Sequence, residues 1–250
     1  MGCKKKRPVS EKERKDMKRT RLKDKGFTLV EIMVSMAISS LVIAGIYGVY
    51  TIQQRSYTVQ EQVSEMQQRI RSALDFMTRN IRMAGYDPSG VCSSDFITAD
   101  EDTLIFDVCE RRTGAQEEFR ITLQYDPDPD PTTDKKTGQL NVTRDDKNTA
   151  SASPMPLAEG VDAFLFSYRD EKGKPLPPSP PVQDIKIVEV SMLVRSSYPD
   201  PRHTDTITYL PASGNAADWI LASGFTNPPS GDEKNFHRRL LTTSIALRNM

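Results

Sequence analysis

Residue types that catalysis and metal binding commonly use are scarce in this sequence. Its 250 residues include two histidines, three cysteines and one tryptophan. The sequence has no Gly-x-Ser-x-Gly nucleophile motif, no histidine and glutamate spacing typical of metal sites, and no phosphate-binding glycine loop. His203 and His237 are expected at the surface, in loops or at strand edges. These absences exclude the enzyme classes that such motifs define, and they favour a protein that is not an enzyme.

Proline is absent from a long stretch of the N-terminal third. Sixteen of the 17 prolines lie from Pro88 onward, and none lies between Pro8 and Pro88. Because proline breaks helices, this gap permits one long helix from about Phe27 to Ala84. Gly85 follows as a plausible C-terminal cap of that helix.

Charge is also absent from part of this stretch, which gives it the character of a membrane span. No charged residue occurs from Ile32 to Gln54, and Phe27–Tyr50 supplies 24 mostly apolar positions, whereas about 20 cross a bilayer core. Residues 1–26 hold 12 Lys and Arg against 4 Asp and Glu, while the remainder holds 22 against 30. The positive-inside rule then places the N-terminus in the cytoplasm and the bulk of the chain outside it. A basic nucleic-acid-binding arm is disfavoured because the basic run stops at the apolar segment, so we predict no direct nucleic-acid partner.

These boundaries predict four parts: a basic leader (1–26), a membrane-spanning helical half (27–50), an amphipathic helical half (51–84) and a head (85–250). In the amphipathic half, apolar residues recur at steps of three and four, which indicates one buried helix face. They are Val59, Val63, Met66, Ile70, Ala73 or Leu74, Met77 and Ile81. We expect this face to cover the sheet of its own domain, and a dimeric coiled coil is the alternative. Gly45 and Gly48 mark either a segment that unwinds easily or a site of close helix packing.

The head has the pattern of an antiparallel sheet. Five segments are rich in β-branched and aromatic residues and predict strands: Thr103–Val108, Glu118–Tyr125, Val161–Tyr168, Asp184–Ser196 and Arg239–Arg248. Segments rich in Pro, Gly, Asp and Ser predict surface loops: Asp126–Lys136, Lys172–Pro181 and Ser223–Lys234. The predicted class is therefore α+β, with a long N-terminal helix packed on an antiparallel sheet.

Two features of the head suggest covalent or metal crosslinks. Cys92 and Cys109 are the only cysteines beyond Cys3, and two cysteines outside the cytoplasm usually pair, with two free thiols as the alternative.

Asp126, Asp128, Asp130 and Asp134 take the spacing of the first ligands of a twelve-residue calcium loop. The match fails at the two positions where a calcium loop has Gly and its final Glu. Alternating Asp-Pro is also typical of an ordinary solvated loop. No cofactor other than calcium at this loop is predicted.

Glu31 stands alone in the apolar run, five residues after Gly26. A charge inside a bilayer costs roughly 2.5–3.5 kcal/mol on insertion scales, so its presence calls for a function. The residues Lys25-Gly-Phe-Thr-Leu-Val-Glu31, with the basic leader before them and the apolar helix after them, resemble the signature of the type IV prepilin family.

That resemblance implies a pilin-like fold and a specific processing site. In the family, a membrane peptidase cuts after the Gly and methylates the new N-terminal residue. Carried over, cleavage falls between Gly26 and Phe27, Phe27 becomes N-methylphenylalanine, and Glu31 sets the register of subunits in a fibre. The implied partners are the prepilin peptidase, other minor and major pilins, the inner-membrane assembly platform and the membrane itself. The implied location is the inner membrane with a periplasmic head, followed by incorporation into a pilus.

Shorter segments narrow the resemblance to the PilW family of minor pilins. They are Ile81–Tyr86, Gly160–Tyr168, Val190–Arg195 and Arg238–Asn249. Minor pseudopilin J of type II secretion shares the architecture and much of the C-terminal pattern, so it is the close alternative. A membrane-tethered binding or enzymatic head that uses the prepilin export route is a further alternative.

Overall fold

The computed structural model of the protein describes residues 26–87, 90, 96–112, 115–130, 132, 137–146 and 152–248. The chain divides into two units, one ending at Arg55 and one beginning at Ser56. Helix α2 (Leu29–Met83) contributes to both units. The first unit holds the N-terminal part of α2, and the second, called the head here, holds the rest of α2 and all the strands.

The predicted helix is confirmed to within two residues at each end. Its helical hydrogen bonding continues through Gly45 and Gly48, so neither glycine interrupts the helix. The helix ends where Gly85 adopts φ of 73°, a left-handed conformation that glycine reaches without strain. The Tyr86 N–H donates to the Met83 carbonyl at 3.0 Å and closes the last turn.

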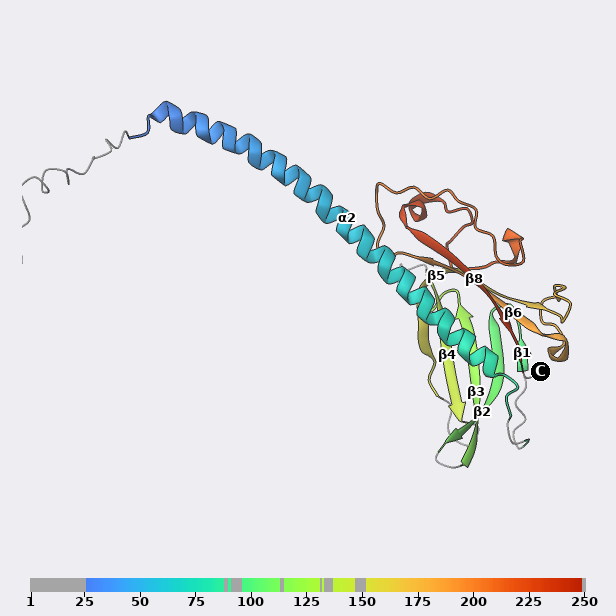
Figure 1. Ribbon diagram of the computed structural model, residues 1–250. Coiled ribbons are helices and arrows are strands. Elements are labelled where there is room, and N and C mark those ends of the chain that lie inside the picture. Colours follow the sequence, from blue (N-terminus) through green and yellow to red (C-terminus); the bar gives the residue numbers. More distant parts are fainter. Residues whose placement is uncertain are drawn as a thin grey trace, which may run out of the picture. The chain divides into compact units, whose positions relative to one another are not determined.

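In the described part of the head, eight strands form one antiparallel sheet (Figure 1). Along the sheet the order is β1-β2-β3-β4-β5-β6-β8, and the short β7 pairs with β5. Their bounds are β1 Phe96–Ala99, β2 Thr103–Arg112, β3 Ala115–Asp126, β4 Gly138–Asp146, β5 Met155–Arg169, β6 Ile187–Arg195, β7 Ile220–Leu221 and β8 Arg238–Ala246. Three short 3-10 helices lie in the connections: η1 Val182–Asp184, η2 Ala216–Asp218 and η3 Gly231–Asn235.

The five predicted strands are confirmed as β2, β3, β5, β6 and β8, and three strands were missed. β1 and β7 have four and two residues, too few for a period to be visible. β4 has nine residues but only Leu140 and Val142 as large apolar residues. It is held mainly by its pairing with β3 and β5, which a local pattern does not encode.

One face of the sheet packs against the C-terminal part of α2. Five residues of the predicted apolar stripe are buried in this core: Met66, Ile70, Ala73, Met77 and Ile81. Their partners on the sheet include Leu104, Phe106, Ile121, Leu123, Leu140, Phe164, Phe166, Val190 and Met192. The stripe therefore covers the sheet of its own domain, as predicted.

The other face of the sheet is covered by the long connection between β6 and β8, residues 196–237. Trp219, Ala222 and Phe225 from this connection pack on Ala163, Leu165 and Leu193 of β5 and β6. The single tryptophan donates its indole N–H to the Tyr209 carbonyl at 2.9 Å. Because β5 and β6 are buried on both faces, their sequences are apolar with little alternation.

Strand β5, whose two faces contribute residues to these two cores, contains a bulge. The register shifts between Val161 and Ala163, so Asp162 is the extra residue of a bulge against β6. Gly160, just before it, has φ of 72° and lies under the guanidinium of Arg69. The bulge places the carboxylate of Asp162 in the protein interior, where it is fully buried.

Candidate functional site

The N-terminal segment of the first unit presents Gly26 and Phe27 ahead of α2. Both residues are exposed and outside the helix, so the peptide bond between them is accessible. Thr28 caps the helix, because its hydroxyl oxygen accepts the Glu31 N–H at 3.2 Å. The Thr28 carbonyl accepts the Ile32 N–H at 3.2 Å and starts the helical hydrogen bonding.

Glu31 lies in the first turn of α2, where the helix dipole favours a negative charge. Its carbonyl accepts the hydroxyl of Ser35 at 2.7 Å, which adds a bond to the helix ladder one turn later. The predicted cleavage residues and Glu31 are thus together at one helix end. The structure contains no second chain, so the predicted register role of Glu31 stays a prediction.

The helix around this end is apolar on all sides and uncovered. The large apolar side chains from Leu29 to Ile46 are exposed, by between 50% for Ile32 and 75% for Leu41, and none of the most apolar window is buried. With a mean hydropathy of 2.2 in that window, α2 is long and apolar enough to cross a membrane. A helix that is apolar on every side requires either lipid or other apolar helices around it.

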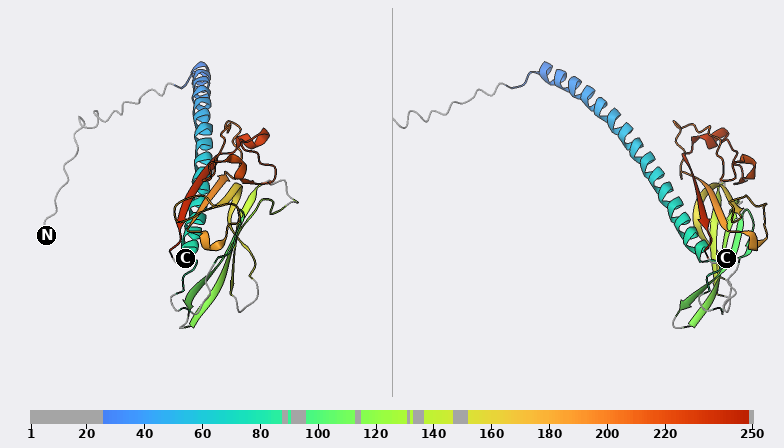
Figure 2. Two further views of the ribbon diagram at one scale, coloured as in Figure 1. Left: turned by 90° about the vertical axis from the view of Figure 1, so that its right-hand side faces the viewer. Right: turned by 45° about the vertical axis from the view of Figure 1, so that its right-hand side comes forward.

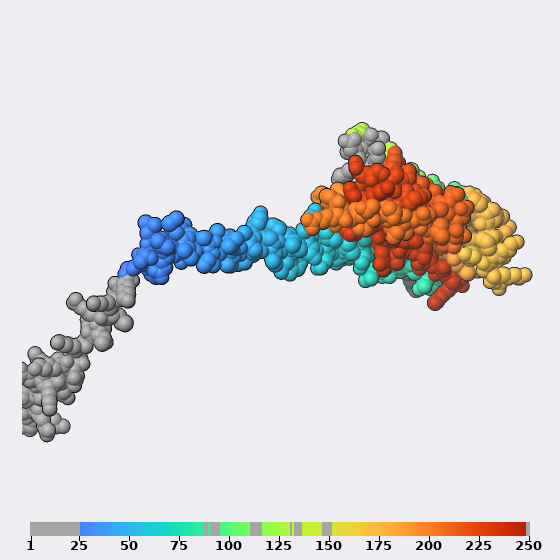
Figure 3. All heavy atoms as spheres, turned by 90° about the horizontal axis from the view of Figure 1, so that it is seen from above, coloured from blue at the N-terminus to red at the C-terminus, as the bar shows by residue number. Residues whose placement is uncertain are grey.

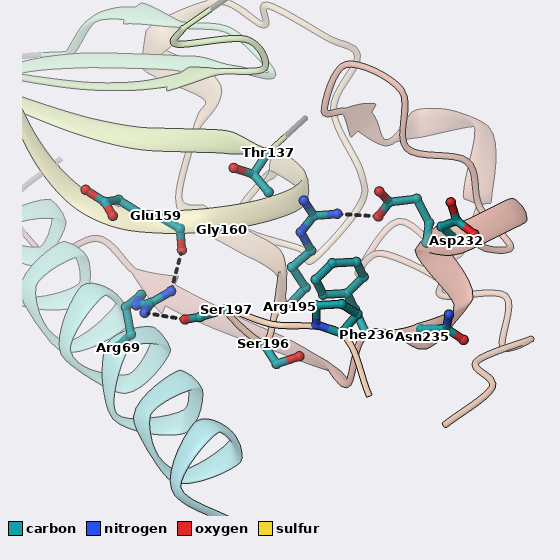
Figure 4. A pocket seen from close by; sticks show the side chains of 12 residues that line it. Arg69, Thr137, Glu159, Gly160, Arg195, Ser196, Ser197, Asp232, Asn235 and Phe236 are labelled. Carbon is teal, nitrogen blue, oxygen red and sulfur yellow. Dashed lines mark hydrogen bonds and ion pairs between the residues drawn. The ribbon is translucent and has the colours of Figure 1, made fainter. Parts of the chain in front are cut away.

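The head has its own cleft of about 590 Å³, which the sequence did not predict (Figure 4). Arg69 of α2 donates to the Glu159 carbonyl at 3.1 Å and to the Glu65 carboxylate at 2.9 Å. On the opposite wall Arg195 of β6 lies over the Phe236 ring, with its guanidinium carbon 4.3 Å from the ring centroid. Arg195 and Glu233, which line the cleft, also belong to a buried charge network.

This network joins the sheet to the β6–β8 connection through two arginines and three carboxylates. The fully buried Arg238 of β8 donates to Asp162 at 2.6 Å, to Asp205 at 3.3 Å and to Glu233 at 3.2 Å. Arg195 pairs with Glu233 and lies 3.5 Å from the second oxygen of Asp162. Burial raises the pKa of Asp162 to about 6, against the opposing influence of both arginines.

The two histidines are half-buried and stacked, which corrects the expectation of isolated surface residues. The rings of His203 and His237 lie 3.9 Å apart between centroids, at an interplanar angle of 24°. His237 also lies 3.5 Å from an oxygen of Asp200. Burial, and then the neighbouring His237, lower the pKa of His203. Among the described residues, no group of three or more His, Cys, Asp or Glu is arranged to hold a metal ion.

The candidate calcium loop is described only in part, because Asp134 lies outside the described residues. The Asp126 carboxylate accepts the Asp128 N–H at 3.0 Å, and the Asp130 carboxylate accepts the Thr132 N–H at 3.1 Å. These are local turns in which each carboxylate satisfies its own backbone. Calcium binding by this loop stays a prediction.

Cys109 lies in β2 and is buried and disulfide-bonded. Its predicted partner, Cys92, lies outside the described residues. The pairing of Cys92 with Cys109 therefore stays a prediction.

Sequence reasoning proposed the N-terminal residues Gly26, Phe27 and Glu31 but missed the head network. Asp162 and Arg195 stand in predicted strands, Arg238 directly precedes the predicted strand Arg239–Arg248, and Asp205 lies in the connection. A signal was present, because Asp162 is the one charge between Val161 and Phe166 in an otherwise mostly apolar strand. A charge at a buried strand position requires a buried partner.

Comparison with known proteins supports the interpretation of the N-terminal segment. Residues 21–47 match the family model of the prokaryotic N-terminal methylation motif. Among the curated proteins no match was found. Among solved structures the chain is similar to a type IV-like pilin from Thermus thermophilus at 10% identity and a TM-score of 0.48, covering 74% of this chain and 98% of that one. The chain thus has a match to a prokaryotic N-terminal methylation motif at the start of a long helix, which is followed by an antiparallel sheet.

Proposed function

We propose that the chain is a PilW-like minor pilin, a membrane-anchored assembly subunit that is cleaved after Gly26 and methylated on Phe27. The observation that carries the proposal is the accessible Gly26–Phe27 bond, which is followed within five residues by Glu31 in the first turn of an uncovered apolar helix. The match to the N-terminal methylation motif supports it. The architecture agrees with it as well.

The proposed role of Glu31 follows from electrostatics in a medium of low polarity. Cleavage creates a positive amine on Phe27 at the start of α2. In a fibre of staggered helices, the Glu31 carboxylate of one subunit meets the Phe27 amine of its neighbour. Their attraction offsets the desolvation of both groups, whereas either group left unpaired is strongly unfavourable. The pair therefore favours one axial stagger between subunits.

In this proposal the apolar part of α2 anchors the chain in the inner membrane and then packs among the helices of other minor and major pilins. The basic leader faces the cytoplasm, where the prepilin peptidase acts, and the head lies in the periplasm. The inner-membrane assembly platform receives the processed subunit. The head contributes to initiating the pilus, as part of a complex of minor pilins.

Processing is tested with Gly26. Replacing Gly26 by Ala or by a bulkier residue should block cleavage, since the peptidase of the prepilin family cuts after a Gly. Mass analysis of the purified chain should then give the full-length N-terminus. Detection of chains that begin at Phe27 despite the change would refute the assigned cleavage site.

Assembly is tested with Glu31. Glu31→Ala and Glu31→Gln should permit export and cleavage yet reduce incorporation into pili and co-purification with other pilins. Ser35→Ala is the matched control one turn away, because it removes only the hydroxyl bond to the Glu31 carbonyl. Normal piliation and normal co-purification in both Glu31 variants would count against the ion pair.

A secretion pseudopilin is the second candidate, because Arg238–Asn249 also resembles pseudopilin J of type II secretion. The two functions separate on one comparison. Deleting the gene should abolish piliation if the chain is a minor pilin. Intact pili combined with loss of protein secretion would assign it to the secretion machine.

A further inference from the structure

The last strand of the sheet, β8, leaves one edge unpaired. β8 stands at the end of the strand order, and its described pairing is with β6 alone. In both views of Figure 2 it lies at the margin of the sheet, and its dark red atoms lie at the surface of the head in Figure 3. Thr242, Ser244 and Ala246 are exposed.

The register shows which backbone groups the open edge presents. The Leu247 N–H donates to the Lys186 carbonyl at 2.9 Å, and the Ser196 N–H donates to the His237 carbonyl at 2.8 Å. Both are directly opposite pairs in continuation of the β6–β8 register, so the odd-numbered residues of β8 bond to β6. The N–H and C=O groups that point outward therefore belong to Leu240, Thr242, Ser244 and Ala246. This set is called the free edge below.

Features that normally protect a sheet edge are missing here. The nine pairs between β6 and β8 run without a register shift, and β8 contains no proline, glycine or lysine. The opposite edge, β1, is only four residues long and has a bulge in its pairing with β2. A long, regular edge with no charge in its centre is a template for another strand, and natural proteins commonly shorten, bend or charge such edges.

The charges at the two ends of the free edge indicate what pairs with it. Arg239 and Arg248 are both exposed, and neither forms an ion pair with the part of the chain that the structure describes. Between them the strand residues from Leu240 to Leu247 carry no charge. The edge is thus neutral in its centre and positive at both ends. At the usual rise per strand residue, the two arginines lie roughly 30 Å apart along the strand.

We propose that the free edge of β8 binds an extended segment of another protein chain, which adds a strand to the sheet. The segment has a neutral, β-branched centre and an acidic residue at each end, about nine residues apart. A second copy of β8 fits poorly, because a register that pairs the whole edge brings Arg239 of each copy next to Arg248 of the other. Main-chain hydrogen bonds provide the affinity, and the two arginines select the acidic ends.

The test uses the full chain in detergent with two synthetic ten-residue peptides. Both have four Thr-Val repeats in the centre, one with Glu at each end and one with Lys at each end. Fluorescence anisotropy should show binding of the acidic peptide and on the order of tenfold weaker binding of the basic one. The combined Arg239→Glu and Arg248→Glu variant should invert this preference, whereas Arg202→Glu, at an exposed arginine elsewhere in the head, should not.

Two further measurements identify the edge itself. In amide hydrogen exchange by NMR, the acidic peptide should slow exchange at the outward N–H groups of Thr242 and Ser244 and leave the inward N–H of Thr243 unchanged. Thr242→Pro removes an outward N–H without removing a bond to β6, so the sheet should persist and peptide binding should be lost. If this variant does not fold, the arginine variants still decide the question.

The proposal is overturned if both peptides bind equally, if neither binds, or if the chain instead dimerises through β8. These measurements require no pilus machinery and do not rest on the proposed function. A chain that binds the acidic peptide but is never cleaved at Gly26 would reject the proposed function and keep the free-edge site.

Discussion

The buried charge network predicts that the stability of the head depends strongly on Arg238. Its side chain is fully buried and contacts three carboxylates, Asp162, Asp205 and Glu233. Arg238→Met keeps much of the side-chain volume at this position and removes the positive charge. Three carboxylates then share one remaining cation, Arg195, in an environment where an uncompensated charge is costly.

The expected loss follows from this geometry. Removing one partner of a buried ion pair costs about 3–5 kcal/mol, because the other partner stays buried without compensation. For a domain of this size, that corresponds to a fall in transition temperature of roughly 6–20 °C. Arg239→Met is the matched control, since the neighbouring Arg239 is exposed and should change stability by less than about 0.5 kcal/mol.

The pH dependence of the loss distinguishes electrostatics from lost packing. The folded-state pKa of Asp162 is raised from 3.8 to about 6, so the folded chain binds this proton more readily than the unfolded chain. This group therefore adds stability as the pH falls from about 6 toward 3.8, and that contribution is lost as the pH rises. Arg238→Met removes an influence that lowers this pKa, so the variant should be destabilised more at pH 8 than at pH 5.

The assay is thermal or urea unfolding of the full chain in detergent, followed by the fluorescence of the single tryptophan. Trp219 is a suitable reporter because it is buried in the core between the sheet and the β6–β8 connection. The double variant Asp162→Asn with Arg238→Met should recover part of the loss, since it also removes the Asp162 charge that Arg238→Met leaves buried without its partner. A loss below about 1 kcal/mol for Arg238→Met, or an equal loss at both pH values, would refute the reasoning.

Three further predictions concern the head. Gly138→Val should destabilise the head by about 1–3 kcal/mol, because a Cβ at Gly138 would overlap the Tyr125 hydroxyl group, which donates to the Val161 carbonyl. An unchanged transition temperature would contradict this. Cys109→Ser should cost about 3 kcal/mol if Cys109 closes the loop to Cys92, and peptide mapping without reduction should find the two cysteines linked rather than Cys109 joined to another chain. Calcium binding by the Asp126–Asp134 loop should give a calorimetric heat that Asp128→Asn removes, and the absence of heat with the unchanged chain would reject the site.

Local sequence patterns were sufficient to predict the helix and much of the sheet. The bounds of α2 follow from the proline gap and Gly85, and its buried face follows from the spacing of Met66 to Ile81. The longest strands carry enough β-branched residues to stand out. The candidate N-terminal site could be proposed from local sequence for the same reason, since Gly26, Phe27 and Glu31 are close in sequence and their pattern does not depend on the tertiary fold.

What the sequence did not reveal depends on contacts between distant residues. Asp162 and Arg238 are 76 positions apart and lie on strands that β6 separates, and their pairing depends on the bulge in β5 at Asp162. The free edge of β8 likewise follows from the strand order, in which the last strand pairs with β6 and ends the sheet. The lone charge of Asp162 signals a buried partner, but neither the identity of that partner nor the free edge can be determined before the sheet topology is known.

The central claim concerns the first residues of the mature chain, and mass spectrometry of its N-terminal peptide tests that claim most directly. Chains purified from the membrane of cells that produce the prepilin peptidase should begin at Phe27 and carry one methyl group on its amine. Chains that retain residues 1–26, or that begin at any residue other than Phe27, would contradict the account.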